Sequence, residues 1–393
     1  MAISLALIII LGLLSDYLFR WIRLPGIIGM LFAGILAGPY VLDLIDPAVI
    51  KVSSDFRMIA LIVILLRAGF ATKRETLNRV GKRALLVGFV PAVFEGAFVA
   101  LIAPFFFHVS PIEAAILGSV VAAVSPAVVV PSMIKFIEDD RGTKKGIPTL
   151  LLASSSLDNV FVIVIFSALI GMYEGESTNI LMKLLDVPVS MTLGITAGIV
   201  TGFALYMIFE IYEPRATKKG MIVIGTAILL TWLEKAVKPF VSISALSGVI
   251  AIGFIILEKS EPMAHKISRK LGKIWVFAEI LLFVLVGTQV NIHVALDAGL
   301  AGAAVIFLGL MARSAGTYIS LIRTGLNFRE KLFCMVAYIP KATVQAAIGA
   351  VPLSIGVRSG EIILAVAVLS ILFTAPIGAI AMNVTGEKFL EKG

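Results

Sequence analysis

The sequence has little of what a water-soluble protein of its length needs. Charged residues make up only 15% of the 393 positions, hydrophobic residues make up 59%, and the mean hydropathy is +1.05. Polar surface is too scarce to cover so much apolar material, so most of the chain must face lipid. The single cysteine, Cys334, lies in an apolar run, which excludes a disulfide framework and a cysteine-ligated metal site.

Two kinds of functional motif are also missing. No GxxxxGK[ST] loop occurs, so a P-loop for nucleotide phosphates is excluded, and uphill transport would have to use an ion gradient. The three histidines, His108, His265 and His293, fall at predicted loops or helix ends, and no HExxH motif occurs. No serine has a histidine available as a base. We therefore expect no enzyme activity, no cofactor and no nucleotide partner.

Apolar runs long enough to span a bilayer recur along the whole chain. Their length and spacing predict an all-α polytopic membrane protein with about thirteen transmembrane helices, in a single membrane domain over residues 1–393. In the seventh run, Gly194, Gly198 and Gly202 repeat at helical spacing, which predicts close packing against another helix inside the molecule. The predicted spans lie near residues 2–19, 25–41, 57–71, 84–107, 112–135, 147–172, 188–210, 220–236, 239–257, 273–290, 298–321, 331–355 and 360–382.

The 33 Lys and Arg residues, which give a net charge of +8, form short clusters between the apolar runs. A nucleic-acid-binding protein would carry them on one continuous stripe, so nucleic acid is not an expected partner. The clusters follow the positive-inside rule if the N-terminus lies outside and the C-terminus lies in the cytoplasm. Anionic lipid is their expected partner. Arg67 and Glu279, near the cytoplasmic surface, are expected to snorkel and to have a structural role.

Charged residues deep inside the apolar runs need a partner or a function, because each costs at least about 2.5 to 3.5 kcal/mol near the bilayer centre. Counting from the predicted helix ends places Glu95, Asp158, Arg313 and Lys341 in one layer near the midplane. Glu95 and Arg313 have opposite charge and matching depth. We pair them as a structural ion pair, with a direct role in transport as the alternative.

Proline interrupts two of the predicted spans, which would cross the membrane in opposite directions. The fifth span contains AAVSPAVVVPS, with Ser125, Pro126 and Pro131, and the twelfth contains YIPKATVQAAIGAVP, with Pro340 directly before Lys341. Proline lacks a backbone donor and leaves carbonyl groups free. Two such segments that cross at the midplane would form a cation site, as in transporters built from inverted repeats. Two ordinary proline kinks are the alternative interpretation.

Polar residues gather in the sixth predicted span, which contains ASSSLDNVFVIVIF. Ser155, Asp158 and Asn159, together with Thr343 of the twelfth span, supply hydroxyl, carboxylate and amide oxygens that suit a hard cation such as Na+ or Li+. A water-filled groove would explain the serines alone but not the carboxylate. Lys341 is expected opposite Asp158 as a titratable counter-charge, so that the site could exchange a proton for a cation.

The segments VSPAVVVP, ASSSLDN and PKATVQAAIG together resemble the monovalent cation:proton antiporter superfamily over essentially the whole chain. The last segment most resembles the NHA-type sodium/proton antiporter branch. The resemblance implies an NhaA-like antiporter fold with two crossed broken helices, a homodimer in the cell inner (plasma) membrane, and a part in pH homeostasis. It also implies a fixed dimerisation subdomain, roughly residues 1–55 and 188–290. A core subdomain, roughly residues 56–172 and 295–385, would move against it like an elevator.

By position, the resemblance places the ion-binding acidic pair at Asp158 and Asn159, the Pro-Lys segment at residues 340–341, and the ion pair at Glu95 and Arg313. The chain departs from the family at Asn159, where antiporters of this branch carry a carboxylate. An amide keeps an oxygen for coordination but cannot take up a proton. Whether this residue is engineered or natural, we expect exchange of Na+ or Li+ for H+ by this sequence to be weak or absent. K+/H+ exchange, a gated cation channel and a transport-inactive ion sensor are the alternatives.

Overall fold

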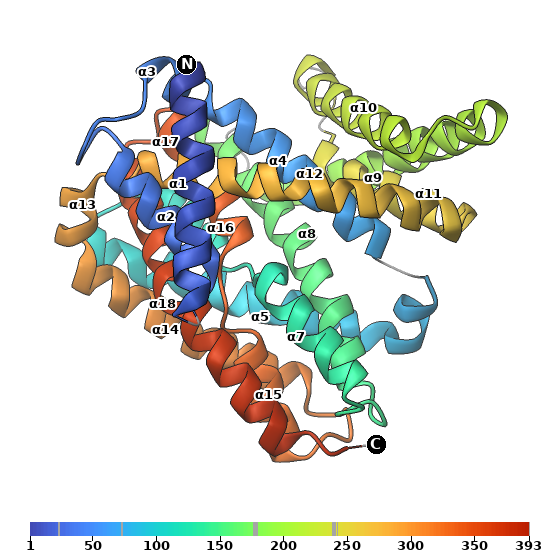
Figure 1. Ribbon diagram of the computed structural model, residues 1–393. Coiled ribbons are helices and arrows are strands. Elements are labelled where there is room, and N and C mark those ends of the chain that lie inside the picture. Colours follow the sequence, from blue (N-terminus) through green and yellow to red (C-terminus); the bar gives the residue numbers. More distant parts are fainter. Residues whose placement is uncertain (23, 72–73, 176–179, 238–240, 242, 393) are drawn as a thin grey trace.

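The computed structural model describes residues 1–393 except 23, 72–73, 176–179, 238–240, 242 and 393, with the backbone alone at 71, 74–80, 82, 127, 131, 134, 138, 156, 160, 180–188, 191 and 235. The described residues form helices joined by loops, with one isolated β-bridge between Arg141 and Lys392 (Figure 1). The helices are α1 (Ala2–Trp21), α2 (Gly26–Ala37), α3 (Pro47–Lys51), α4 (Ser53–Ala71), α5 (Arg74–Phe107), α6 (Pro111–Val121), α7 (Pro126–Glu138), α8 (Ile147–Tyr173), α9 (Ile180–Tyr212), α10 (Ala216–Val237), α11 (Ala245–Lys259), α12 (Glu261–Thr288), α13 (Ile292–Asp297), α14 (Gly299–Ser320), α15 (Phe328–Ala337), α16 (Thr343–Ile348), α17 (Val351–Ser354) and α18 (Gly360–Phe389).

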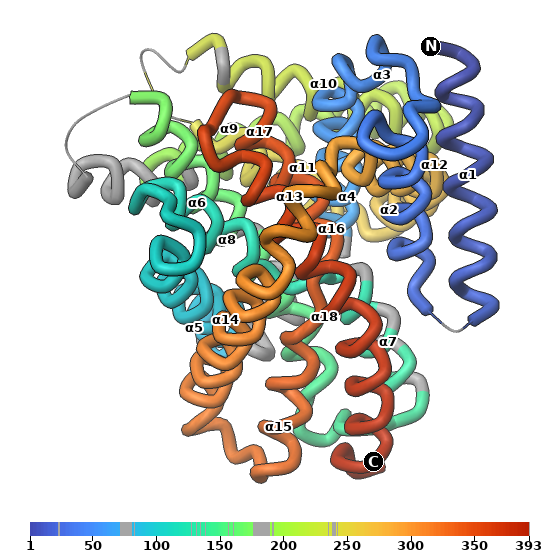
Figure 2. Tube along the Cα trace, turned by 90° about the vertical axis from the view of Figure 1, so that its left-hand side faces the viewer, coloured from blue at the N-terminus to red at the C-terminus, as the bar shows by residue number. Residues whose placement is uncertain are grey.

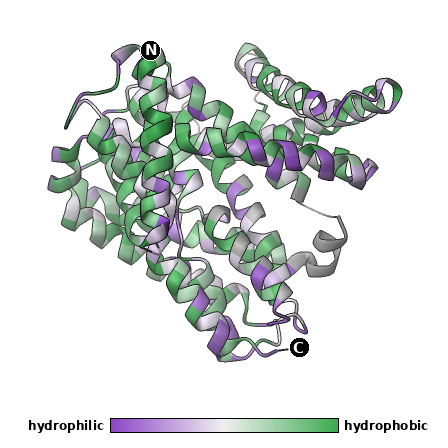
Figure 3. Ribbon diagram, in the orientation of Figure 1, coloured by the Kyte–Doolittle hydropathy of each residue, from purple (hydrophilic) through white to green (hydrophobic). Residues whose placement is uncertain are grey.

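The outer surface of the molecule is apolar over long stretches of helix. Large hydrophobic side chains such as Ile10, Leu300 and Phe307 are exposed, and Figure 3 shows hydrophobic residues over most of α1 and hydrophilic ones in the first half of α12. Such a surface needs lipid to cover it. Within the described residues, eight helices are long and apolar enough to cross a membrane, and shorter apolar helices such as α2 accompany them. The number of about thirteen spans stays a prediction.

The helices pack in two groups. In the first, α2 and α4 pack on α12, α4 and α9 pack on α11, and α1 packs on α2. In the second, α5 contacts α6, α8 and α14, while α18 contacts α14 and α15. Figure 2 shows α1 at one edge of the molecule and α5 with α14 at the opposite edge. Helix α4 falls in the range predicted for the core subdomain, yet it packs mainly on α11 and α12 of the first group.

The glycine repeat of α9 forms a packing seam inside the chain, as predicted. A Cβ atom at Gly198 would meet the backbone of Gly248, and one at Gly194 would meet the backbone of Ser244. Glycine allows the two backbones to approach this closely, because no side chain separates them. The seam holds α11 in place beside α4 and α12.

The first broken helix consists of α6 and α7, separated by residues 122–125. Ser125 has extended backbone angles, φ −90° and ψ 111°, because the residue before a proline avoids the helical region. Pro126 is the first residue of α7, where the helix needs no N–H donor. Pro131, predicted as part of the break, lies instead inside α7. Its missing N–H removes one backbone hydrogen bond there, and the helix continues.

The second broken helix consists of α15 and α16, separated by residues 338–342 around Pro340. The two breaks meet, since the N–H of Ser125 donates to the carbonyl oxygen of Pro340 at 2.8 Å. In Figure 2, α7 and α15 lie towards the end that carries the C-terminus, while α6 and α16 lie nearer the end that carries the N-terminus. The structure therefore contains two crossed broken helices, as predicted.

Candidate functional site

Asp158 lies on α8 directly beside the crossing, and its side chain is fully buried. One carboxylate oxygen, Oδ2, accepts a hydrogen bond from the backbone N–H of Val124 in the first break at 2.7 Å. The other, Oδ1, accepts one from Nη2 of Arg313 at 2.8 Å. Both oxygens of Asp158 are thus already engaged by the protein.

Glu95 on α5 and Lys341 in the second break complete a group of four buried charges, which we call the charge network (Glu95, Asp158, Arg313 and Lys341). Nη1 of Arg313 lies 2.9 Å from Oε2 of Glu95. Nζ of Lys341 lies 2.7 Å from Oε1 of the same carboxylate. All four side chains are at most 1% exposed. Two positive and two negative charges balance, which a buried group of ions requires.

The pairing inside the charge network differs from the expectation for Lys341. Lys341 was expected opposite Asp158, but its ammonium group contacts Glu95, and the cation in contact with Asp158 is Arg313. The cause is the shape of the guanidinium group, whose separate N–H donors reach both carboxylates at once. Arg313 further donates from Nε to the carbonyl oxygen of Tyr338 at 2.8 Å and from Nη1 to the carbonyl oxygen of Ala122.

Three further backbone groups of the two breaks form hydrogen bonds with side chains. Gln345 spans the crossing: its Nε2 donates to the carbonyl oxygen of Ala123 at 2.7 Å, and its Oε1 accepts from the N–H of Ala342 at 2.9 Å. The N–H of Lys341 donates to Oγ1 of Thr374 at 2.9 Å. Gln345 lies four residues after Lys341 in an apolar run, so the sequence already marks it as a polar group near the break. Thr374 on α18 carries no sequence signal for this role.

Three buried hydroxyl or amide oxygens of the predicted site residues have no hydrogen-bond partner among the described residues. We call them the unpaired oxygens: Oγ of Ser125, Oδ1 of Asn159 and Oγ1 of Thr343. Ser155, also predicted as a ligand, is fully buried and donates to the carbonyl oxygen of Leu152 at 3.1 Å. A buried oxygen without a donor is unfavourable unless a guest supplies positive charge. The unpaired oxygens are therefore candidates for binding a cation.

A cavity of about 370 Å³ reaches Asn159 and Thr343 from the side of α12. Its walls come from α4, α11 and α12 of the first group and, on the other side, from α8 of the second group and the broken-helix segments α7 and α16. At the far end, Arg67 and Ser268 also line an adjacent surface depression with Arg269. The cavity therefore leads from this surface to the side chains of Asn159 and Thr343.

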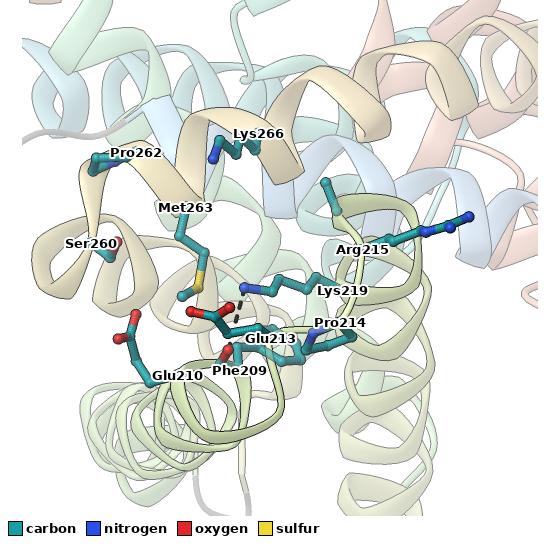
Figure 4. Close-up of a pocket in the computed structure, with 11 residues that line it drawn as sticks. Phe209, Glu210, Glu213, Pro214, Arg215, Lys219, Ser260, Pro262, Met263 and Lys266 are labelled. Carbon is teal, nitrogen blue, oxygen red and sulfur yellow. Dashed lines mark hydrogen bonds between the residues drawn. The ribbon is translucent and has the colours of Figure 1, made fainter.

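A second cavity, about 390 Å³ in volume, lies where α9 joins α10 and α11 joins α12. Figure 4 shows Lys219 beside Glu213 and Met263, while Arg215 extends away from them. Nζ of Lys219 donates to the carbonyl oxygen of Phe209 at 3.4 Å. None of the predicted site residues lines this cavity.

The family model of the transmembrane domain of sodium/hydrogen exchangers matches residues 4–386. The chain belongs to the sodium/hydrogen exchanger family. It is 33% identical to sodium/hydrogen exchanger 9B2 of Mus musculus, with 94% of this chain and 69% of that protein covered. It is 32% identical to sodium/hydrogen exchanger 9B1 of Homo sapiens, with 94% and 73% covered.

Solved structures confirm the fold of this sodium/hydrogen exchanger. The sodium proton antiporter MjNhaP1 from Methanocaldococcus jannaschii superposes with a TM-score of 0.87 at 20% identity, over 98% of this chain and 97% of that one. The all-α antiporter fold is thereby confirmed, and the superfamily resemblance is confirmed by the family model and the relatives. The exchangers are multi-pass membrane proteins that move Na+ and H+ as secondary transporters without a cofactor, so the family is not one of enzymes.

Proposed function

We propose that this exchanger binds Na+, or Li+, beside Asp158, and that position 159 is where the exchanged proton would bind if it carried a carboxylate. The observation that carries the proposal is the contrast at the crossing, where the unpaired oxygens lie next to a carboxylate whose own oxygens are both engaged. Asn159 and Thr343 line the cavity through which an ion would arrive. Neutral oxygens beside one carboxylate suit a small monovalent cation, because the ion adds a single charge to a neutral charge network.

Asn159 is the reason we propose that exchange by this sequence is weak or absent. Proton exchange needs a group that is protonated in one state and ionised in the other, and an amide has no ionised form of that kind. Both oxygens of Asp158 are already engaged, by Arg313 and by the N–H of Val124. The chain would then bind a cation without releasing a proton. An aspartate at position 159 would restore the exchange.

We further propose elevator motion of a core subdomain against a dimerisation subdomain in a homodimer. The core subdomain comprises roughly residues 56–172 and 295–385, and the dimerisation subdomain roughly residues 1–55 and 188–290. One element departs from this division: α4 is assigned to the dimerisation subdomain, because it contacts α11 and α12. The cavity lies between the two groups, so sliding one past the other would open and close it. This would serve pH homeostasis.

The exchanger would lie in the cell inner (plasma) membrane with its N-terminus outside and its C-terminus in the cytoplasm. The cavity would then open to the cytoplasm, where the basic loops are expected. Anionic lipid is the proposed partner of the basic residues Arg215, Lys219 and Lys266, which line the cavity of Figure 4.

The test is sodium-driven proton movement in proteoliposomes between pH 6 and 9, with this chain and its Asn159→Asp variant compared. We expect exchange by the variant and little or none by the chain as written. Equal exchange by both would contradict the role of position 159. Exchange by neither, with sodium still crossing the membrane, would favour a gated channel; without sodium movement, a transport-inactive ion sensor. Substituting K+ for Na+ tests the K+/H+ alternative.

A further inference from the structure

The cavity that reaches Asn159 has two opposite charges in its wall. Arg67 enters the wall from α4, and Glu279 enters it from α12. Trp275, one helical turn before Glu279, lies beneath the Arg67 guanidinium carbon, which is 5.7 Å from the centre of the indole ring. Among the described residues that line the cavity, Glu279 is the one carboxylate and Arg67 the one cation.

The approach to this cavity is basic. The adjoining surface depression is lined by Arg67, His265 and Arg269, without an acidic residue among its described lining. A sodium ion that enters from this side therefore passes the unfavourable field of Arg67 and Arg269, while His265 is paired with Glu261, with Nε2 3.1 Å from Oε1. Glu279 is the group in the described wall that can offset this field.

The surroundings of Glu279 leave its charge available to the cavity. The groups that act on it are Arg67 on α4, the pair Asp16 and Arg20 on α1, and the side chain of Trp275, which donates a hydrogen bond to its carboxylate. Asp16 and Arg20 neutralise each other, with Nε of Arg20 2.8 Å from Oδ1 of Asp16. The Arg67 guanidinium group also makes a cation–π contact with the ring of Trp275, which competes with its attraction to Glu279. Glu279 is half-buried and can be approached by an ion that still carries part of its water.

We propose that Glu279 admits cations to the site: its carboxylate offsets the Arg67 guanidinium and holds a partly hydrated sodium ion on its way to Asp158 and Asn159. This inference rests on the proposed cation exchange at that site. A single carboxylate with water as the remaining ligand binds sodium weakly. Weak binding suits an entry position, because an ion must leave it quickly for the next one.

The first experiment measures the electric potential in the cavity without transport. Cys334→Ser removes the native thiol, and Val130→Cys places a reporter in the cavity wall on α7. The reporter is modified with a cationic and an anionic methanethiosulfonate of similar size. Glu279→Gln should lower the ratio of the cationic to the anionic rate by at least about 5-fold, because a nearby unit charge has been removed.

Glu210→Gln is the matched control, since it removes an exposed carboxylate that lies outside this cavity. It should leave the rate ratio unchanged. An unchanged ratio in Glu279→Gln would overturn the inference. Failure of both reagents to modify the reporter would overturn it as well, because the cavity would then not admit ions.

The second experiment measures exchange in the Asn159→Asp background. Adding Glu279→Gln should raise the KM for sodium by about 3- to 10-fold with kcat unchanged, because entry and not chemistry is affected. A fall in kcat at constant KM would contradict the inference. If the Asn159→Asp chain does not exchange at all, the proposed function fails, and the thiol experiment still decides the role of Glu279.

Discussion

Two neighbouring regions of the crossing differ in whether their buried polar groups have partners inside the protein. Every member of the charge network has a partner of opposite charge at 2.7 to 2.9 Å inside the protein. The unpaired oxygens belong to neighbouring residues on the same broken helices and on α8, and they have no hydrogen-bond partner among the described residues. The comparison teaches that burial alone does not identify a binding site. Groups with internal partners hold the two breaks together, whereas groups without partners are available to a guest.

The largest effect is expected when Arg313, the cation that Glu95 and Asp158 share, is removed from the charge network. Arg313→Met leaves Glu95 and Asp158 with one cation between them and frees the carbonyl oxygens that Arg313 caps. We expect a loss of about 3 to 5 kcal/mol in unfolding free energy, since a buried charge loses its partner. Thermal or denaturant unfolding of the purified protein in detergent measures it.

Arg323→Met is the matched control, because it makes the same replacement at an exposed loop position. Its effect on unfolding should be small. The account would be wrong if both variants unfolded at the same temperature.

Two threonines sharpen the comparison further, because the same substitution removes a hydroxyl from each region. Thr374→Val leaves the buried N–H of Lys341 without its acceptor, so we expect a loss of about 1 to 3 kcal/mol. Thr343→Val removes a hydroxyl that has no partner, so the unfolding free energy should change by less than about 0.5 kcal/mol. Parallel unfolding experiments measure both. Equal losses would show that Thr343 also has a structural partner.

A smaller effect is expected on the thermal stabilisation of the protein by bound sodium. Bound sodium raises the unfolding temperature in proportion to its affinity for the folded state. In Thr343→Val the sodium concentration needed for a given rise should increase by about 3- to 10-fold, since one ligand oxygen is lost. Thr374→Val should show the same sodium dependence as the parent chain. A reversed order would assign the cation to the charge network.

The smallest effect is predicted at the edge of the core, where Nζ of Lys145 lies 2.8 Å from Oε1 of Glu330. Its hydrogen bond to Glu330 raises the pKa of Lys145 above its ordinary value. The stabilisation that this ion pair gives the fold is therefore complete at pH values below the ordinary pKa of lysine, and it is lost only as the pH rises through the raised pKa of Lys145. Lys145→Gln should lower the unfolding temperature less than Thr374→Val, by the same amount at pH 6 and pH 9. A marked difference between these pH values would contradict the sign.

The sequence contained enough to place the crossing but not to predict its contacts. Pro126 and Pro340 predict the two breaks because proline lacks a donor, whatever surrounds it. The depth of the four charges is also a matter of counting along helices. Which carboxylate each cation contacts depends on helix rotation and side-chain reach, so Lys341 was assigned to Asp158 instead of Glu95.

The cavity was beyond prediction for a related reason. Its walls come from six helices that are distant in the sequence, and only their packing brings Glu279 and Arg67 into line with Asn159. Depth alone suggested that these two charges snorkel to the surface, and nothing in the sequence gives a void between two groups of helices.

Proton release on sodium binding tests the central claim most directly. Sodium is added to the purified protein in weakly buffered detergent solution, and the pH change is followed with an indicator dye, for this chain and for Asn159→Asp. The account predicts about one proton released per sodium by the variant and none by the chain as written. Proton release by the chain as written would contradict it, because a member of the charge network would then be exchanging the proton.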